Sequence, residues 1–235
     1  MSKRGLGKAL EDALQGKEEK RPKKGIKSVL SSPVRRQIYQ YLTLHPGAYL
    51  SLISKDLLIS IHTLEWHLNK LRAADYIEEE RIGGYRIYFP THLVDKNEIM
   101  PLHLLHRENH RLIFSCILHH PGMSMKECSE NCGLSVSSAV TAIKDLKTEN
   151  LITAVEDGRF RRYFPSDRLQ ELITYGKERQ ESFLKWLMER LHEEGLEPEI
   201  DRREEGIAQI TIKSMSGTSG ITVGLNPWST VLKIL

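Results

Sequence analysis

A predicted helix from residue 61 to about residue 71 carries side chains that could contact nucleic acid. Ser60 precedes it as a cap, and apolar residues at 61, 64, 68 and 71 form one stripe that should face a core. Because residues three and four apart share a helix face, the remaining positions are expected to point outward. These positions hold His62, Thr63, Trp66, His67 and Lys70. Their hydrogen-bond donors and stacking ring suit a major groove; the alternative is a solvated face, which an exposed tryptophan disfavours.

A second basic feature is the string GRFRRYFP at residues 158–165, which is expected to be one strand of a hairpin. Side chains alternate between the two faces of a strand. The related string GGYRIYFP at residues 83–90 places Tyr85, Ile87 and Phe89 on the face expected to point inward. By the same parity Phe160 and Phe164 should anchor the second hairpin to its domain.

The arginines of these hairpins are expected to divide in the same way. Arg86, Arg159 and Arg161 should point outward, where a hairpin arginine can bind phosphate or enter a minor groove. Arg162 replaces the inward Ile87, so it should leave the core at an edge or pair with an acid, and we do not predict it to contact DNA.

These elements belong to a duplication. A shift of 75 residues aligns residues 29–90 with residues 104–165 without a gap, and both His-Pro-Gly and Tyr-Phe-Pro recur. In each copy, helical periodicity covers three helices and is followed by strand periodicity around a glycine-containing turn. Three helices and a hairpin are the order of a winged helix-turn-helix. We therefore predict two copies of one domain rather than a solenoid.

The outward positions of the third helix differ in the second copy. They hold Ser137, Ser138, Thr141, Ala142 and Asp145. The hydroxyl groups can meet phosphates or bases, whereas Asp145 would be repelled by the DNA backbone. Two alternatives stay open: this helix reads bases, or the second copy binds the duplex mainly through its hairpin.

The predicted fold class is α+β, with two tandem winged helices followed by a long helix and a small antiparallel sheet. The long helix is expected from residue 167 to about residue 194, with strands at 207–213, 221–225 and 230–235 and turns at 217–220 and 226–227. The predicted divisions are a flexible basic tail (1–28), winged helix 1 (29–92), a linker (93–103), winged helix 2 (104–166) and a third, smaller C-terminal domain (167–235).

Composition limits the class of protein. The chain has 235 residues and a net charge of +3, and no apolar run approaches the roughly 20 residues that cross a bilayer. We expect a cytoplasmic protein without membrane contact. The three cysteines do not suggest a disulfide framework. Because the sequence contains no phosphate loop, nucleophile elbow or zinc-spaced cysteine pairs, we expect no enzyme activity, cofactor or metal.

The tail before residue 29 concentrates the positive charge. Arg21, Lys23 and Lys24 belong to a basic arm directly before the first winged helix, where they could bind phosphates, although a solubilising tail is the alternative. Further out, apolar residues at 6, 10 and 14 share a helix face that could fold onto a partner groove.

Cys128, Cys132 and nearby histidines allow a thiol or metal switch as another hypothesis. The repeat opposes it, because Cys116, Cys128 and Cys132 align with expected core positions of the first copy. Small buried thiols are the preferred interpretation.

Residues 60–77, SIHTLEWHLNKLRAADYI, resemble the recognition helix and following strand of ArsR- and MarR-like winged-helix transcription regulators, especially archaeal ones with two winged helices in one chain. The resemblance covers roughly residues 29–165 and is weaker in the second copy, where Ala142 and Asp145 depart from it. It implies sequence-specific binding of double-stranded DNA, promoter control and a homodimer. It also implies base contacts by the five outward residues of the first copy and a phosphate contact by Arg86.

The first residues separately resemble the peptide by which ParB-type partition proteins engage a ParA-type ATPase. The matching positions are Lys3, Arg4, Leu6, Gly7 and Leu10. An adaptor that links DNA to such an ATPase is therefore an alternative to the regulator. A tandem winged-helix scaffold that binds proteins rather than DNA is a further alternative, as in condensin-accessory and membrane-sorting complexes.

Overall fold

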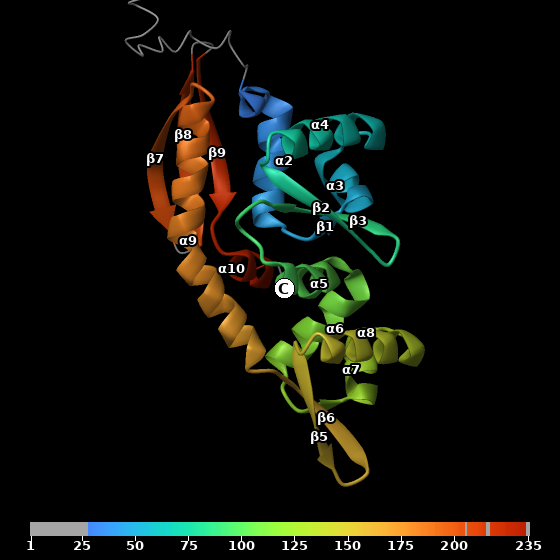
Figure 1. The fold of residues 1–235 in the computed structure, drawn as a ribbon. Helices are drawn as coiled ribbons and strands as arrows, with labels where there is room; N and C mark the ends of the chain where they lie inside the picture. The colour runs from blue at the N-terminus through green and yellow to red at the C-terminus, as the bar shows by residue number, and fades with distance from the viewer. Residues whose placement is uncertain (1–27, 205, 215–216, 234–235) are drawn as a thin grey trace, which may run out of the picture.

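The first half of the chain folds into a unit of helices and a small sheet, and the computed structural model describes residues 28–204, 206–214 and 217–233 (Figure 1). The helices of this first unit are η1 (Val29–Ser31), α2 (Pro33–Leu44), α3 (Leu50–Leu57) and α4 (Ile61–Ala73), and the strands are β1 (Ala48–Tyr49), β2 (Ile77–Ile82) and β3 (Tyr85–Pro90). The strands are antiparallel in the order β1-β3-β2. Proline at the first position of α2 starts that helix, since its fixed φ suits a first turn.

The second unit repeats this order of elements. It contains α6 (Glu108–His119), β4 (Met123–Ser124), α7 (Met125–Asn131), α8 (Val136–Thr148), β5 (Ile152–Asp157) and β6 (Phe160–Pro165). Its sheet has the order β4-β6-β5, with β6 in the same central place as β3. The periodicities that predicted three helices and a hairpin in each copy correspond to these elements.

The segment between the units differs from the prediction. Residues 93–103 were expected to be a linker, but most of them belong to α5 (Lys96–His106). Asp95 and Glu98 form a capping box at its start, in which the side chain of each residue accepts a hydrogen bond from the backbone N–H of the other. The helix is almost entirely buried because it lies between the two units and the C-terminal part of the chain.

The C-terminal part contains α9 (Arg168–Glu193), β7 (Glu197–Glu204), β8 (Ile207–Ser214), β9 (Gly217–Gly224) and α10 (Pro227–Leu232). The predicted long helix is present as α9, and the first two predicted strands are present as β8 and β9. The strand predicted at 230–235 is wrong, because Asn226 caps a helix there and accepts hydrogen bonds from the backbone N–H groups of Trp228 and Ser229. The prediction also missed β7, an edge strand whose charged sequence has no apolar alternation, and it placed a turn at 217–220 where β9 begins.

The sheet of the C-terminal part packs against the first unit. The edge strand β9 lies along α2: the backbone N–H of Thr222 donates to Gln40 Oε1 at 3.0 Å, and that of Gly224 donates to Thr43 Oγ1 at 3.1 Å. Helix side chains thus satisfy donors that an uncovered sheet edge would leave free. A Cβ at Gly224 would fall well inside van der Waals contact of the Thr43 carbonyl, so this close approach requires glycine.

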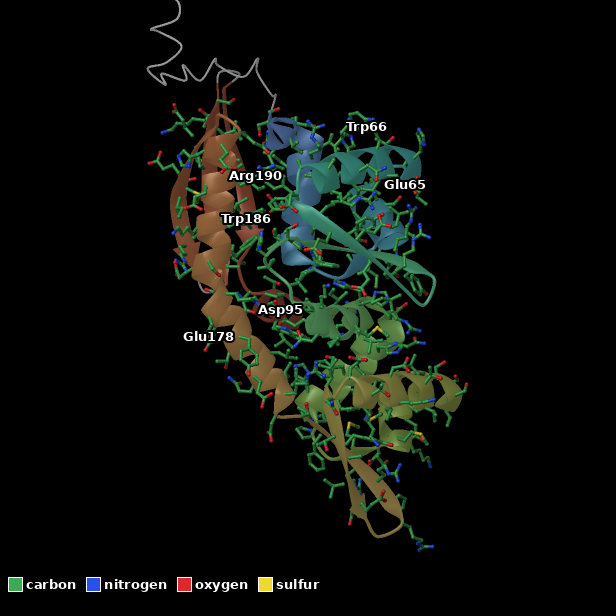
Figure 2. All side chains as sticks on the ribbon, in the orientation of Figure 1. Glu65, Trp66, Asp95, Glu178, Trp186 and Arg190 are labelled. Carbon is green, nitrogen blue, oxygen red and sulfur yellow. The ribbon has the colours of Figure 1, made fainter. Side chains whose placement is uncertain are left out.

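Helix α9 joins the two ends of the molecule. Its N-terminal turns start beside the second unit, and its C-terminal half lies along the sheet β7-β8-β9 and also contacts the first unit (Figure 1). Trp186 and Arg190 of this half are labelled in Figure 2. The Trp186 ring contacts Tyr76 and His92, and Arg190 Nη2 donates to the carbonyl of Ala74 at 3.0 Å.

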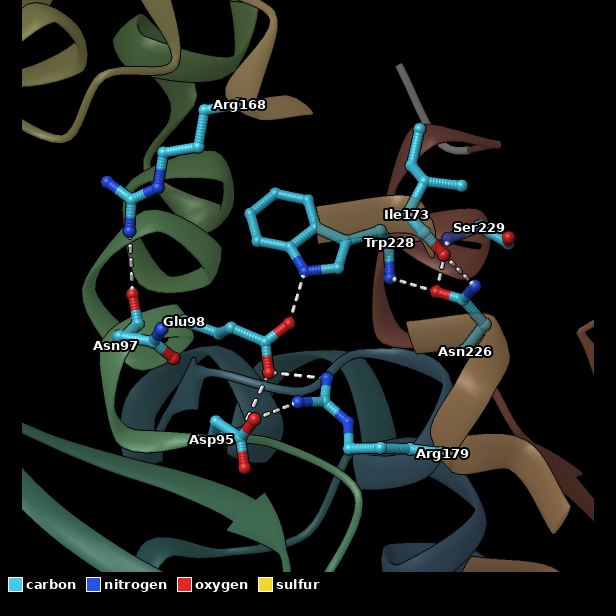
Figure 3. A network of polar contacts seen from close by, with 9 residues as sticks. All are labelled: Asp95, Asn97, Glu98, Arg168, Ile173, Arg179, Asn226, Trp228 and Ser229. Atoms are coloured by element: carbon cyan, nitrogen blue, oxygen red, sulfur yellow. Dashed lines mark hydrogen bonds and ion pairs between the residues drawn. The ribbon is translucent and has the colours of Figure 1, made fainter. Parts of the chain in front are cut away.

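A buried polar network connects α5, α9 and α10 (Figure 3). Glu98 accepts a hydrogen bond from Trp228 Nε1 at 2.8 Å and another from Arg179 Nη2 at 2.5 Å, and Arg179 also pairs with Asp95. Because Glu98 is almost completely buried, these donors replace the water that its carboxylate would otherwise bind.

The apolar face of α9 is buried within the chain. Phe183, Leu184, Leu187 and Leu191 all belong to the core. Gly176 leaves room for the side chain of Asn226, which donates a hydrogen bond to the carbonyl of Ile173 at 3.0 Å. This face therefore packs within the chain rather than facing outward. Within the described ranges, none of the helices has the length and apolar character needed to span a bilayer.

Candidate nucleic-acid interface

Helix α4 presents a polar, exposed face at its N-terminal end. Ser60 caps the helix by accepting a hydrogen bond from the backbone N–H of Thr63 at 3.3 Å, while Leu64, Leu68 and Leu71 are buried below. His62, Thr63, Trp66 and Lys70 are exposed, as the sequence predicted. The cap fixes the end of the helix, so these four side chains share a defined surface.

Trp66 dominates this surface. Its side chain is 53% exposed and projects from α4 away from the rest of the first unit (Figure 2). The ammonium group of Lys70 lies 5.7 Å from the centre of its ring, within range of a cation–π interaction. A large exposed ring beside a cation can stack on a base or contact a thymine methyl group while the cation meets phosphate.

His67 was expected to point outward and does not. It is only 9% exposed, and burial, together with the charge of Arg35, lowers its pKa. The apolar stripe of α4 includes this position because residues i, i+3, i+4 and i+7 share the inner face, here 64, 67, 68 and 71. Ala142, the equivalent position in α8, is fully buried for the same reason, so its predicted outward placement is also wrong.

The hairpin arginine of the first unit is already paired. Arg86 on β3 forms an ion pair with Glu65 on α4, and about a third of each side chain is exposed. The hydrogen bond to Glu65 raises the pKa of Arg86. Arg86 thus holds the hairpin against α4 rather than pointing freely outward. This pair could not be inferred from the sequence, since Glu65 and Arg86 lie on different elements.

Helix α8 faces a different environment from α4. Ser137 and Thr141 are exposed and Ser138 is half-buried, and all three line a cleft of about 480 Å³ beside Tyr49 and Tyr85 of the first unit. Periodicity within one copy cannot reveal this cleft, because it lies between the two units.

Asp145, the acid expected to oppose DNA binding by α8, is paired within the chain. It accepts a hydrogen bond from His110 Nε2 at 2.9 Å and lies 3.6 Å from Arg107. Its charge is therefore partly compensated by the start of α6.

The second hairpin departs from the predicted parity at two residues, whereas Arg159 and Arg161 are exposed as predicted and Phe164 is half-buried. Phe160 is 59% exposed, whereas Tyr163 is only 6% exposed. The tip of the hairpin extends beyond the core (Figure 1), and the Phe160 ring packs there against the guanidinium carbon of Arg162, 5.7 Å from the centre of the ring. The base of β6 lies between β4 and β5 and is covered there. The prediction that Phe160 anchors the hairpin is wrong, as is the inward placement of its counterpart Tyr85, which is also exposed.

The three arginines of this hairpin differ in their contacts. Arg161 pairs with Glu156 at 2.6 Å, and Arg162 pairs with Asp157 at 3.1 Å and Glu127 at 3.0 Å, as expected for an arginine that replaces a core residue. Arg159 is exposed at the tip and has no ion pair among the described residues.

Several predicted residues lie outside the described residues. They are the basic arm residues Arg21, Lys23 and Lys24 and the tail positions Lys3, Arg4, Leu6, Gly7 and Leu10.

The cysteines occupy core or near-core positions. Cys128 is buried, and burial raises the pKa of its thiol to about 12. Cys116 and Cys132 are half-buried. Throughout the part of the chain that the structure describes, no group of three or more His, Cys, Asp or Glu side chains is placed to hold a metal ion.

Comparison with known proteins adds a family match over the first unit. Residues 32–99 match the HTH_HVO_0163_N family profile, described as an N-terminal HTH domain. The chain is 30% identical over 130 residues to an uncharacterized HTH-type transcriptional regulator, MJ1398, of Methanocaldococcus jannaschii. That alignment covers 55% of this chain and 32% of the relative, so the chain spans about a third of the length of the curated relative it matches.

Among solved structures, reduced HlyU from Vibrio cholerae aligns at 20% identity and a TM-score of 0.29, over 30% of this chain and 74% of HlyU. The transcriptional regulator SlyA aligns at 16% identity and a TM-score of 0.27, over 36% of this chain and 61% of SlyA. From the sequence matches, the chain carries an HTH domain in its first unit and is homologous to an archaeal HTH-type transcriptional regulator.

Proposed function

We propose that the protein is a sequence-specific, double-stranded DNA-binding transcription regulator whose first unit inserts α4 into a major groove. The observation that carries this proposal is the exposed face of α4, on which His62, Thr63, Trp66 and Lys70 project from a capped N-terminal end. The HTH match over residues 32–99 and the name of the relative support it. A regulator of chromosomal promoters would act in the cytoplasm and needs no catalytic residues.

The second unit acts, in this proposal, as a second winged helix. Its repeated order of elements and its sheet order β4-β6-β5 support that assignment. Because Ser137, Ser138 and Thr141 line a cleft beside the first unit, we assign base reading mainly to α4. Arg159 is the hairpin arginine best placed for phosphate, since Arg86 and Arg161 are paired with acids.

The test is selection of bound sequences from a random duplex library, followed by titration of the selected duplex at several salt concentrations. We expect a specific motif and an affinity that falls steeply with salt. Trp66→Ala and Lys70→Ala should each lower affinity for the selected duplex, with Trp66→Ala relaxing sequence choice, whereas Lys185→Ala on α9 should not. Binding that is absent at low salt, or equal for the variants of α4 and the wild type, would refute the proposal.

The ParA-linked adaptor stays a second candidate on the sequence of the tail alone. Deletion of residues 1–14 should abolish stimulation of a ParA-type ATPase and leave duplex binding intact. If the full chain does not stimulate such an ATPase, the adaptor hypothesis is wrong.

A further inference from the structure

The second unit contains a groove that its hairpin forms with α7 and α8. The groove has a volume of about 1140 Å³, and its apolar wall includes Met125, Val140, Ile143 and Phe160. Lys144, Lys147 and Arg159 lie at its border. The volume exceeds the roughly 300–1,000 Å³ of ordinary small-molecule pockets, which favours a segment of a macromolecule as the occupant.

The equivalent surface of the first unit is closed by ion pairs between helix and sheet. Glu65 of α4 pairs with Arg86 of β3, and Arg72 of α4 pairs with Glu79 of β2 at 2.8 Å. These two bridges cross the space between the recognition helix and the hairpin, so side chains of the first unit fill the space themselves.

In the second unit the acidic partners of both bridges have been replaced by apolar residues. A shift of 75 residues places Val140 at the position of Glu65 and Ala154 at the position of Glu79, while the cations persist as Arg161 and Lys147. Because Val140 replaces the acid at the position of Glu65, Arg161 pairs instead with Glu156 within its own hairpin. Lys147 has no ion pair within the described part of the chain. The carboxylates that line the groove are already paired, Glu127 with Arg162, Glu130 with Lys126 and Glu156 with Arg161, so the charges left unpaired there are positive.

Apolar side chains at this groove are exposed to water. Val140 is 43% exposed and Phe160 is 59% exposed, so both place apolar side chains at surface positions that a polar residue could occupy. Clustered exposed apolar residues with a polar border are typical of an interaction site.

We propose that this groove, defined as the surface between α7, α8 and the β5–β6 hairpin, binds an acidic amphipathic helix of a partner protein. The apolar face of such a helix would cover Val140 and Phe160, and its carboxylates would meet Lys144 and Lys147. DNA fits less well, because a phosphate backbone has no apolar face to cover Phe160. The chain's own first 28 residues fit less well too, since they hold nine Lys or Arg against four Asp or Glu.

The test uses the full chain and a fluorescently labelled peptide of about 18 residues, with leucine and phenylalanine on one helical face and glutamate on the other. The control peptide has the same composition in scrambled order, which removes the apolar face. Fluorescence anisotropy should show binding of the first peptide that weakens with salt, with at least about tenfold weaker binding of the scrambled peptide. Absence of binding at low salt, or equal binding of both peptides, would overturn the proposal.

Two sets of variants assign the binding to this groove. Val140→Glu places an acid opposite Arg161, at the position that Glu65 holds in the first unit. The double variant Lys144→Glu with Lys147→Glu reverses the charge at the border of the groove. Each should weaken peptide binding at least about tenfold, whereas the control Lys185→Glu on α9 should change it less than twofold. If Val140→Glu does not fold by thermal unfolding, the double variant decides, since Lys144 is exposed and Lys147 half-buried.

Duplex DNA serves as the competing class of ligand. Val140→Glu is expected to leave affinity for the selected duplex within twofold, which separates this proposal from DNA reading by α4. Peptide binding that neither set of variants weakens would overturn the proposal. A loss of duplex affinity in Val140→Glu as large as the loss of peptide affinity would also overturn it and would identify the groove as a DNA surface.

Discussion

The indole Nε1 of Trp228 donates a 2.8 Å hydrogen bond to Oε1 of Glu98, although the two residues are 130 positions apart in the sequence. The same carboxylate accepts a hydrogen bond from Arg179, so α5, α9 and α10 meet at one buried acid (Figure 3). This junction fixes the segment between the two units to the C-terminal part of the chain. The relative placement of the units therefore depends on residues outside both of them.

Glu98→Ala should destabilise the protein by about 3–5 kcal/mol, because it leaves the largely buried guanidinium of Arg179 without its most buried partner. The free energy of unfolding from urea titration measures this change. Trp228→Phe is the matched comparison, since it removes one hydrogen bond and keeps an aromatic ring, and it should cost less. Equal, negligible effects of both variants would show that the network does not stabilise the junction.

Gly224→Ala should loosen the C-terminal sheet from the first unit. The added Cβ would collide with the carbonyl of Thr43 on α2, and relief of such a collision costs about 1–3 kcal/mol. Gly220→Ala on the same strand is the control, because a Cβ there meets no atom within 4 Å. Thermal unfolding should separate the two variants, and an equal midpoint for both would contradict the close packing of β9 on α2.

Stability should fall in mild acid because of two histidines on α5. Nε2 of His106 lies 2.9 Å from the Pro46 carbonyl, and Nδ1 of His103 lies 3.4 Å from the Gly47 carbonyl. Burial lowers the pKa of each from 6.5 to about 4. Between these values the unfolded chain binds protons that the folded chain does not, so stability holds above pH 6.5 and declines towards pH 4.

The expected slope from these groups is about 1.4 kcal/mol per pH unit for each histidine. Urea unfolding at intervals from pH 7 to pH 4 measures it. His103→Gln should reduce the slope, whereas the same substitution at the exposed His62 of α4 should leave it unchanged. A slope that does not respond to His103→Gln would mean that other groups cause the acid sensitivity.

Glu65→Ala should strengthen duplex binding if the first unit binds DNA as proposed. The change frees Arg86 from its ion pair and removes a negative charge beside the recognition face. We expect a gain of roughly three- to tenfold at low salt and one additional phosphate contact in the salt dependence. Titration at several salt concentrations measures both quantities.

The control for this variant is Glu189→Ala, which removes an exposed acid from α9 whose ion pair among the described residues is with Lys185 at 3.9 Å. It should leave duplex affinity unchanged. Weaker duplex binding by Glu65→Ala would show instead that the pair with Arg86 positions the hairpin for contact.

Most of the local structure could be predicted from the sequence because local signals determine it. The Ser60 cap, the apolar stripe of α4 and the hairpin glycines each act over a few residues, and the repeat supplies them twice. The exposed positions of His62, Thr63, Trp66 and Lys70 follow from helix geometry alone. His67 does not, because the width of the buried stripe depends on how deeply α4 packs on its neighbours.

The sequence alone determined the two-copy order of helices and strands and the residues that α4 exposes at its N-terminal end. Only the tertiary structure decided which charges are free, where the C-terminal sheet packs and that residues 227–232 are helical. The physical reason is range: helical and strand periodicities act between neighbours a few residues apart, whereas the pairs Glu65–Arg86, Glu98–Trp228 and Thr43–Gly224 depend on how separate elements meet. For the same reason the open groove beside Val140 becomes visible only when the two folded copies are compared.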